Sequence, residues 1–88
     1  DKIVENLLSR PEFKVVLNGY TDASGSADYN RMISESRAST VKMYFAGKEV
    51  NPTRMTIVGH GAKNFAAGND SEEGRRMNRR VEINLVDK

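Results

Sequence analysis

The chain has 88 residues, of which 38% are hydrophobic and 30% are charged. This length supports one hydrophobic core but not two, and the composition is that of a folded protein, so we expect a single domain over residues 1–88. The net charge of +2 is too small to hold the whole domain on nucleic acid or on an anionic membrane. The absence of cysteine excludes disulfides, thiolate metal sites and cysteine nucleophiles.

The first two predicted elements are a helix and a strand. Apolar residues recur at helical spacing up to Pro11 and predict a short amphipathic helix over residues 1–10. The apolar run that follows, closed by Gly19, is too short for a helix and predicts a mostly buried strand over residues 13–19. Residues 20–26 are polar and predict a loop.

The middle of the chain predicts a long helix and a second strand. An apolar stripe at helical spacing indicates a helix over residues 27–46, with Gly47 as its C-terminal stop. The stripe consists of Tyr29, Ile33, Val41, Tyr44 and Phe45. A turn at residues 51–52 precedes a run over residues 55–58 that is typical of a strand.

The last third predicts a long loop, a short helix and a final strand. Residues 59–70 contain three glycines and form the loop, and Ser71 begins the helix. Apolar and polar residues alternate over residues 80–85, so we expect one face of this strand to lie on the core. This order of elements predicts an α/β fold, an α+β sandwich in which helices pack on one small mixed sheet that contains a right-handed βαβ unit.

Two charged residues predict a binding site at one end of the sheet. Asp22 follows the first strand, and open α/β sheets place their ligand crevices at the carboxyl ends of strands. Arg37 falls on or beside the apolar stripe of the long helix and must turn toward a polar partner. The simplest interpretation is an ion pair of Arg37 with Asp22 or Glu35. The alternative is a pocket for a zwitterion, with Asp22 accepting from an ammonium group and Arg37 holding a carboxylate.

Other polar residues could contribute to this pocket. Asn30 could donate or accept at its mouth, although an asparagine near a helix start also bonds to the local backbone. Ser24 and Ser26 are ordinary candidates for the helix N-cap. Arg79, at the entry of the last strand, could reach the same crevice.

The run Arg75-Arg76-Met77-Asn78-Arg79-Arg80 is the strongest local charge feature and gives an alternative function, a basic nucleic-acid-binding module. Acidic residues flank the run and no aromatic residue adjoins it for base stacking, so a solvated face is the simpler interpretation. His60 is the single histidine, which leaves no imidazole and thiolate cluster for a metal and no reason to expect a cofactor. A hydrolase built on Ser24 or Asp22 with His60 is the weakest alternative, so we expect no catalytic residues.

Read in order, several segments resemble the motifs of the OmpA-like peptidoglycan-binding family, the domain found at the C-terminus of OmpA-like and MotB-like proteins. The segments are Asn18-Gly19-Tyr20-Thr21-Asp22, Tyr29-Asn30, Ile33-Ser34-Glu35-Ser36-Arg37-Ala38 and Asn78-Arg79-Arg80-Val81-Glu82. The resemblance extends over nearly the whole chain. It implies the OmpA-C-like fold and a non-catalytic anchor in the periplasm of a Gram-negative bacterium.

The ligand that the resemblance implies is the diaminopimelate group of the peptidoglycan stem peptide, whose side chain ends in an ammonium and a carboxylate. Asp22 would accept from the ammonium and Arg37 would hold the carboxylate. Asn30, Arg79 and backbone groups near Ala23 would complete the pocket, and Ser24 stands where the family sometimes adds a hydroxyl contact. The domain would tether an outer-membrane protein, a lipoprotein or a motor stator to the cell wall, with the membrane anchor outside this chain.

The chain departs from the family in two places. Tyr20 replaces the histidine that usually precedes the Thr-Asp pair, and we expect this to change packing beside the loop more than the charge pair. The family normally has a strand before the first helix, whereas this chain starts in that helix. We therefore expect an unpaired sheet edge and a monomer or a weak dimer.

Overall fold

The computed structural model describes residues 2–86 and contains every helix and strand that the sequence predicts. The elements are α1 (Lys2–Ser9), β1 (Lys14–Gly19), α2 (Ala27–Gly47), the 3₁₀ helix η1 (Pro52–Arg54), β2 (Met55–Gly59), α3 (Glu72–Asn78) and β3 (Val81–Val86). The predicted first helix also included Asp1, which lies outside the described residues.

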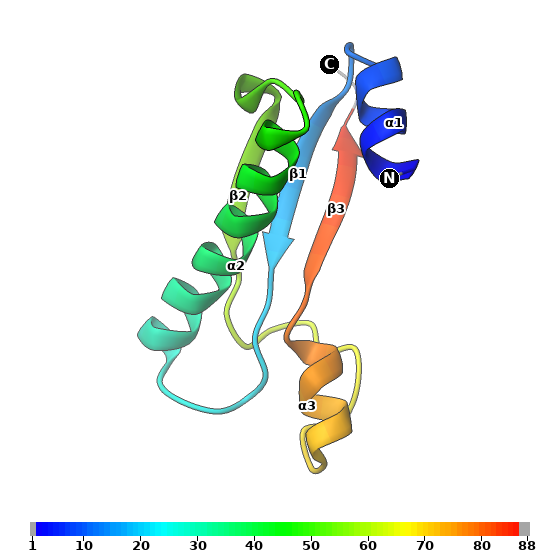
Figure 1. The fold of residues 1–88 in the computed structure, drawn as a ribbon. Coiled ribbons are helices and arrows are strands. Elements are labelled where there is room, and N and C mark those ends of the chain that lie inside the picture. Colours follow the sequence, from blue (N-terminus) through cyan, green and yellow to red (C-terminus); the bar gives the residue numbers. More distant parts are fainter. Residues whose placement is uncertain (1, 87–88) are drawn as a thin grey trace.

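Three strands form one mixed sheet in the order β2, β1, β3. β1 runs parallel to β2, with Val15 opposite Met55, and antiparallel to β3, with Val15 opposite Leu85. α2 connects β1 to β2 across one face of the sheet, and Figure 1 shows that this crossover is right-handed. The predicted α/β fold, with helices packed on a small mixed sheet, is confirmed.

The hydrophobic core lies between the sheet and the helices α1 and α2. Val15 and Leu17 are fully buried on the face of β1 that turns toward these helices, and the alternate residues Val16 and Asn18 lie on the opposite face. The buried apolar residues of the core are Val4, Leu7, Val15, Leu17, Ala38, Phe45, Val50 and Met55. In the described part of the chain α3 adds no residue to this cluster, and it lies beyond the end of the sheet (Figure 1).

The face of α2 that packs on the sheet differs from the predicted stripe. Tyr29 and Tyr44 are half exposed, and the residues that α2 buries are Asn30, Ser34, Ala38 and Phe45. Small residues are needed there because the helix approaches the sheet very closely. A Cβ atom placed on Gly19 would lie only 2.0 Å from the carbonyl oxygen of Ser34. The apolar pattern alone therefore selected the wrong residues for part of this face.

The ends of α2 follow the predicted chemistry at one end only. Ser26 is the N-cap, as predicted, and its hydroxyl oxygen accepts from the Tyr29 backbone N–H at 3.2 Å. Gly47 is not the C-terminal stop, because it is still helical. The residue in the left-handed conformation beyond the helix is Glu49, with φ of 74°.

Arg54 ties the end of α1 and the start of β1 to the segment that enters β2. Its guanidinium donates to the carbonyl oxygens of Leu7 at 2.8 Å and Arg10 at 2.7 Å, and its Nε donates to the Phe13 carbonyl at 3.1 Å. The Leu7 carbonyl lies in the last turn of α1, where carbonyl groups lack intrahelical partners, and those of Arg10 and Phe13 lie in the connection to β1.

Replacing Arg54 with alanine is therefore expected to lower the free energy of unfolding by about 2–4 kcal/mol, because three hydrogen bonds to the backbone are lost together. The midpoint of urea unfolding measures this change. Arg76→Ala, on the exposed side of α3, is the control and is expected to stay within about 0.5 kcal/mol of wild type. Equal midpoints for both variants would contradict the role given to Arg54.

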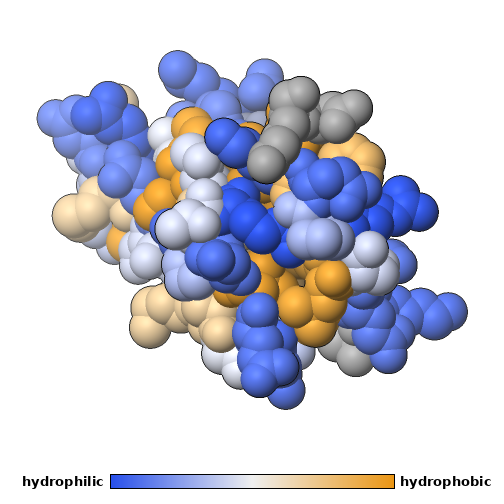
Figure 2. All heavy atoms as spheres, turned by 90° about the horizontal axis from the view of Figure 1, so that it is seen from above, coloured by the Kyte–Doolittle hydropathy of each residue, from blue (hydrophilic) through white to orange (hydrophobic). Residues whose placement is uncertain are grey.

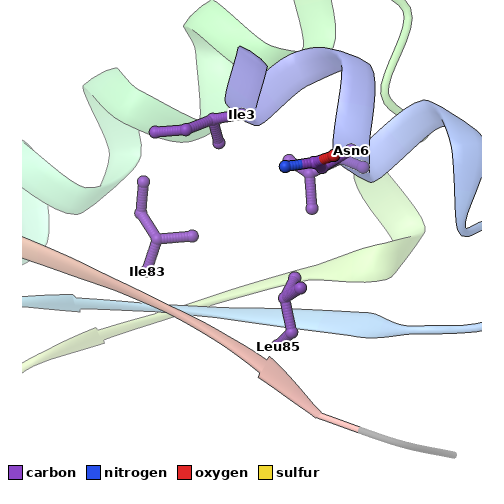
Figure 3. A pocket seen from close by; sticks show the side chains of 5 residues that line it. Ile3, Asn6, Ile83 and Leu85 are labelled. Atoms are coloured by element: carbon purple, nitrogen blue, oxygen red, sulfur yellow. The ribbon is translucent and has the colours of Figure 1, made fainter.

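β3 forms one edge of the sheet, and its outer side has no strand partner among residues 2–86. A hollow of about 210 Å³ lies between this strand and α1, lined by Ile3, Asn6, Leu7, Ile83 and Leu85 (Figure 3). Val81 and Ile83 pack against the core, but Leu85 keeps 46% of its surface exposed, so the predicted burial of this face is wrong at its end. Figure 2, which views the molecule from above relative to Figure 1, shows apolar surface between hydrophilic residues.

Candidate functional site

Asp22 lies just beyond the carboxyl end of β1, where the sequence predicted a site, and is almost completely buried. Its Oδ1 accepts from the Ser24 backbone N–H at 2.9 Å, and its Oδ2 accepts from Arg79 Nη1 at 2.6 Å. The hydrogen bond from Ser24, together with the Arg79 guanidinium, lowers the pKa of the Asp22 carboxyl although burial opposes the shift. Asp22 is therefore a fixed carboxylate at neutral pH.

Arg79 connects Asp22 to α3. Besides Asp22 it contacts Glu72, a half-exposed residue in the first turn of α3, through Nη2. The hydrogen bond from Arg79 lowers the pKa of Glu72. In turn, the hydrogen bond to Glu72 and, to a smaller extent, that to Asp22 raise the pKa of the Arg79 guanidinium. Arg79 thus reaches the crevice, as the sequence predicted, while Glu72 is a member of the site that the sequence did not predict.

Arg37 reaches the same loop from α2, although it pairs with no carboxylate of residues 2–86. Its Nη1 donates to the Tyr20 carbonyl oxygen at 3.4 Å, two residues before Asp22. The simple ion-pair interpretation is wrong, because Asp22 pairs with Arg79 and Glu35 lies 3.9 Å from Arg31. The guanidinium keeps most of its donors available beside the loop.

Asn30, Ala23 and Ser24 line the loop in different ways. Asn30 is 95% buried against Gly25 and Gly61, and within residues 2–86 its side-chain amide makes no hydrogen bond. The backbone N–H of Ala23 donates to Asn69 Oδ1 at 3.2 Å. Ser24 is exposed and its N–H donates to Asp22 Oδ1, while the N-cap of α2 is Ser26. The Asn30 Oδ1 atom lies beside Gly25, in the loop that carries Asp22.

Two asparagines that the sequence did not single out for this role hold the loop before α3. The side chain of Asn78 is fully buried and accepts from the N–H groups of Ala66 at 2.7 Å and Ala67 at 3.0 Å. It also donates to Asn69 Oδ1 at 3.0 Å, the same atom that receives the Ala23 N–H. The Asn-Arg-Arg motif was the available signal, because its asparagine orders this loop while its first arginine reaches Asp22.

Tyr20 lies in an aromatic stack beside the site. Its ring is parallel to that of His60 with centroids 4.8 Å apart, and the Arg80 guanidinium lies 4.1 Å from its centroid. His60 also bonds Asn18 Oδ1 at 2.7 Å. His60 is therefore held by a ring contact and a side-chain hydrogen bond. The stack holds the Tyr20 backbone, whose N–H donates to the Arg80 carbonyl at 2.8 Å.

The arginine run is mostly engaged within the protein. Arg75 bonds Glu72 and the Asn69 carbonyl, and Arg80 bonds Glu82 and the Asn64 carbonyl. Within residues 2–86, Arg76 alone of the four arginines has no polar partner. The arginine run is therefore only partly the solvated face that the sequence predicted. Few of its guanidinium donors remain available to bind phosphate groups.

Over residues 2–86 no group of three or more histidine, aspartate or glutamate side chains could hold a metal ion. No helix in this part of the chain is both long enough and apolar enough to cross a bilayer. The hollow between α1 and β3 is lined almost entirely by apolar side chains, so it lacks charged groups for a polar ligand. The loop after β1 brings together the buried carboxylate of Asp22, the guanidinium groups of Arg37 and Arg79, and the Asn30 amide. This set of groups suits a ligand that carries both a positive and a negative charge.

The free energy of unfolding is expected to fall as the pH drops below about 4.5, because Asp22 and Glu72 both have a lowered pKa in the folded protein. The stabilisation is complete above the ordinary carboxyl pKa and is lost as the pH falls through the lowered values. Asp22→Asn should flatten this dependence in urea unfolding. A pH profile of Asp22→Asn identical to that of wild type would argue against the assignment.

Comparison with known proteins gives concordant matches. The model of the OmpA family matches residues 1–79. Outer membrane protein A of Bordetella avium is 43% identical over 72 residues, covering 82% of this chain and 37% of that protein. Peptidoglycan-binding protein ArfA of Mycobacterium bovis is 39% identical over 83 residues, covering 94% of this chain and 26% of that protein. The chain thus spans well under half the length of these relatives.

A solved structure shares the fold. The peptidoglycan-associated lipoprotein from Burkholderia pseudomallei superposes with a TM-score of 0.89 at 25% sequence identity. The superposition covers 96% of this chain and 71% of that chain. The helices, the mixed sheet and the loop after β1 therefore belong to an architecture that has been observed experimentally.

Proposed function

The chain belongs to the OmpA family, and on this premise we propose that it binds peptidoglycan without catalysing a reaction on it. Two of the matched proteins, ArfA and the lipoprotein from Burkholderia pseudomallei, carry peptidoglycan binding or association in their names. Nearly the whole of this chain aligns with each of them, which supports a function of the domain itself.

The proposed ligand group is the diaminopimelate of the stem peptide. The main observation behind this proposal is the buried carboxylate of Asp22, whose loop is contacted by the guanidinium groups of Arg37 and Arg79. Asp22 accepts from the ligand ammonium. Arg37, which bonds the Tyr20 carbonyl through only one of its donors, holds the ligand carboxylate by two parallel hydrogen bonds. The two ligand charges are thereby paired with opposite protein charges.

The remaining contacts come from groups that border the same loop. Asn30 supplies an amide that makes no side-chain hydrogen bond within residues 2–86, so its donors and acceptor are available to the ligand. Arg79 orients Asp22, while the backbone near Ala23 and the exposed hydroxyl of Ser24 supply further polar contacts. Asn69 and Asn78 act behind these groups by fixing the loop.

In the cell we propose that this domain works in the periplasm as a wall anchor. The protein that carries it would be an outer-membrane protein, a lipoprotein or a motor stator. A single site of this kind needs only modest affinity, because many copies in one membrane face one polymer and gain from multivalency. No cofactor and no chemical step enter this function.

Co-sedimentation with purified insoluble peptidoglycan tests this function. The domain is expected to pellet with the polymer, to be released by excess soluble stem peptide, and to free no soluble wall fragments. The basic nucleic-acid alternative predicts binding to DNA that falls steeply with salt and does not depend on Asp22. A folded domain that stays in the supernatant with peptidoglycan, or that binds DNA with this salt dependence, would refute the proposal.

A further inference from the structure

Arg79 is shared between two carboxylates from different parts of the chain. Nη1 donates to Asp22 Oδ2 at 2.6 Å, and Nη2 donates to Glu72 in the first turn of α3. The Asp22 side chain is 8% exposed, whereas that of Glu72 is 55% exposed and lies outside the hydrophobic core. Glu72 therefore joins the site only through Arg79.

The pair of Asp22 with Arg79 works against the capture of a ligand ammonium. A guanidinium at 2.6 Å neutralises the Asp22 carboxylate, and its positive charge repels a second cation that approaches. Glu72 gives the same guanidinium a second anionic partner, so the three side chains together keep a negative charge for the ligand. Arg75 contacts Glu72 more weakly, at 3.3 Å from the side of α3.

We propose that Glu72 is a positioning residue which, by sharing Arg79, leaves the Asp22 carboxylate able to select ligands that carry an ammonium group. The inference rests on the proposed function and extends it to the specificity of the same site. With Glu72 removed, Asp22 is the one carboxylate that still pairs with Arg79 among residues 2–86, and Arg79 competes fully with the ammonium. Affinity for ligands without an ammonium does not depend on this balance.

A helix-stabilising role for Glu72 would give a different result. An acidic side chain in the first turn also stabilises a helix through its dipole, and loss of that effect would disturb α3 whatever the ligand. Glu73 offers the matched control, since it lies in the same turn, carries the same charge, and has no polar partner within residues 2–86.

The test compares two peptides by calorimetric titration of wild type, Glu72→Gln and Glu73→Gln. One peptide carries diaminopimelate, and the other carries 2-aminopimelate at that position, which keeps the side-chain carboxylate but lacks the ammonium. Wild type should prefer the first peptide, and Glu72→Gln should reduce this preference by about three- to tenfold while Glu73→Gln preserves it. Thermal unfolding of each variant checks that the fold is retained.

An equal loss for both peptides in Glu72→Gln would show a structural role and overturn the inference, as would an unchanged preference. These outcomes leave the proposed function standing, because wild type still binds the diaminopimelate peptide. A folded wild-type domain that binds neither peptide would instead refute the proposed function, and the inference with it.

Discussion

Replacing Asp22 with alanine is expected to weaken binding of the diaminopimelate peptide by about 2–5 kcal/mol, which abolishes measurable binding at ordinary concentrations. The ligand ammonium would enter a crevice without an anionic partner, beside an Arg79 that has lost its pair. Both charges would be left partly desolvated, and an unpaired desolvated charge costs more than a missing neutral hydrogen bond. Calorimetric titration of the variant against wild type measures the loss.

Asp28→Ala is the control for this experiment. Asp28 is exposed in the first turn of α2, and its replacement removes the same charge from the same end of the domain. It should bind as wild type does. Arg37→Ala should lose binding to a similar extent through the unpaired ligand carboxylate. Retention of wild-type affinity by a folded Asp22→Ala domain would place the binding site elsewhere.

Replacing Gly19 with alanine is expected to cost about 3 kcal/mol or more of folding free energy, although it adds a single methyl group. The added Cβ would lie 2.0 Å from the Ser34 carbonyl oxygen, so α2 would have to move away from β1. The atoms in the way are backbone atoms of Ser34, which cannot move aside as the end of a flexible side chain can. Because α2 also carries Asn30 and Arg37, binding should be lost with stability.

Gly47→Ala provides a matched control, since a Cβ at this helical position meets nothing within 4 Å. Alanine loses less backbone entropy than glycine in a helix, so this variant should gain about 0.5–1 kcal/mol. Urea unfolding of both variants gives the comparison. A Gly19→Ala domain as stable as wild type would contradict the close packing of α2 on β1.

The elements of the fold could be predicted because each has a local signal. The apolar run ended by Gly19 marks β1, the serine at position 26 caps α2, and the alternation in β3 matches a strand with one apolar face. The face of α2 could not be predicted in the same way. Its burial depends on how closely the helix approaches glycines in the sheet, which the apolar pattern of the helix does not encode.

The residues of the candidate site could likewise be predicted in part, whereas their contacts could not. Asp22 was predictable from its place after β1, and Arg79 from its place before β3. The partners of these residues were not, because Glu72 and Asp22 are far apart in the sequence and meet only through Arg79. The aromatic stack was missed for a similar reason, since Tyr20 and His60 lie at the ends of adjacent parallel strands.

The most direct test of the central claim is a calorimetric titration of the wild-type domain with two stem peptides that differ at one residue. One contains diaminopimelate, and the other contains lysine, which keeps the ammonium but lacks the side-chain carboxylate. The account predicts binding of the diaminopimelate peptide and at least about tenfold weaker binding of the lysine peptide. Equal affinity for both, or no binding by a folded domain, would contradict it.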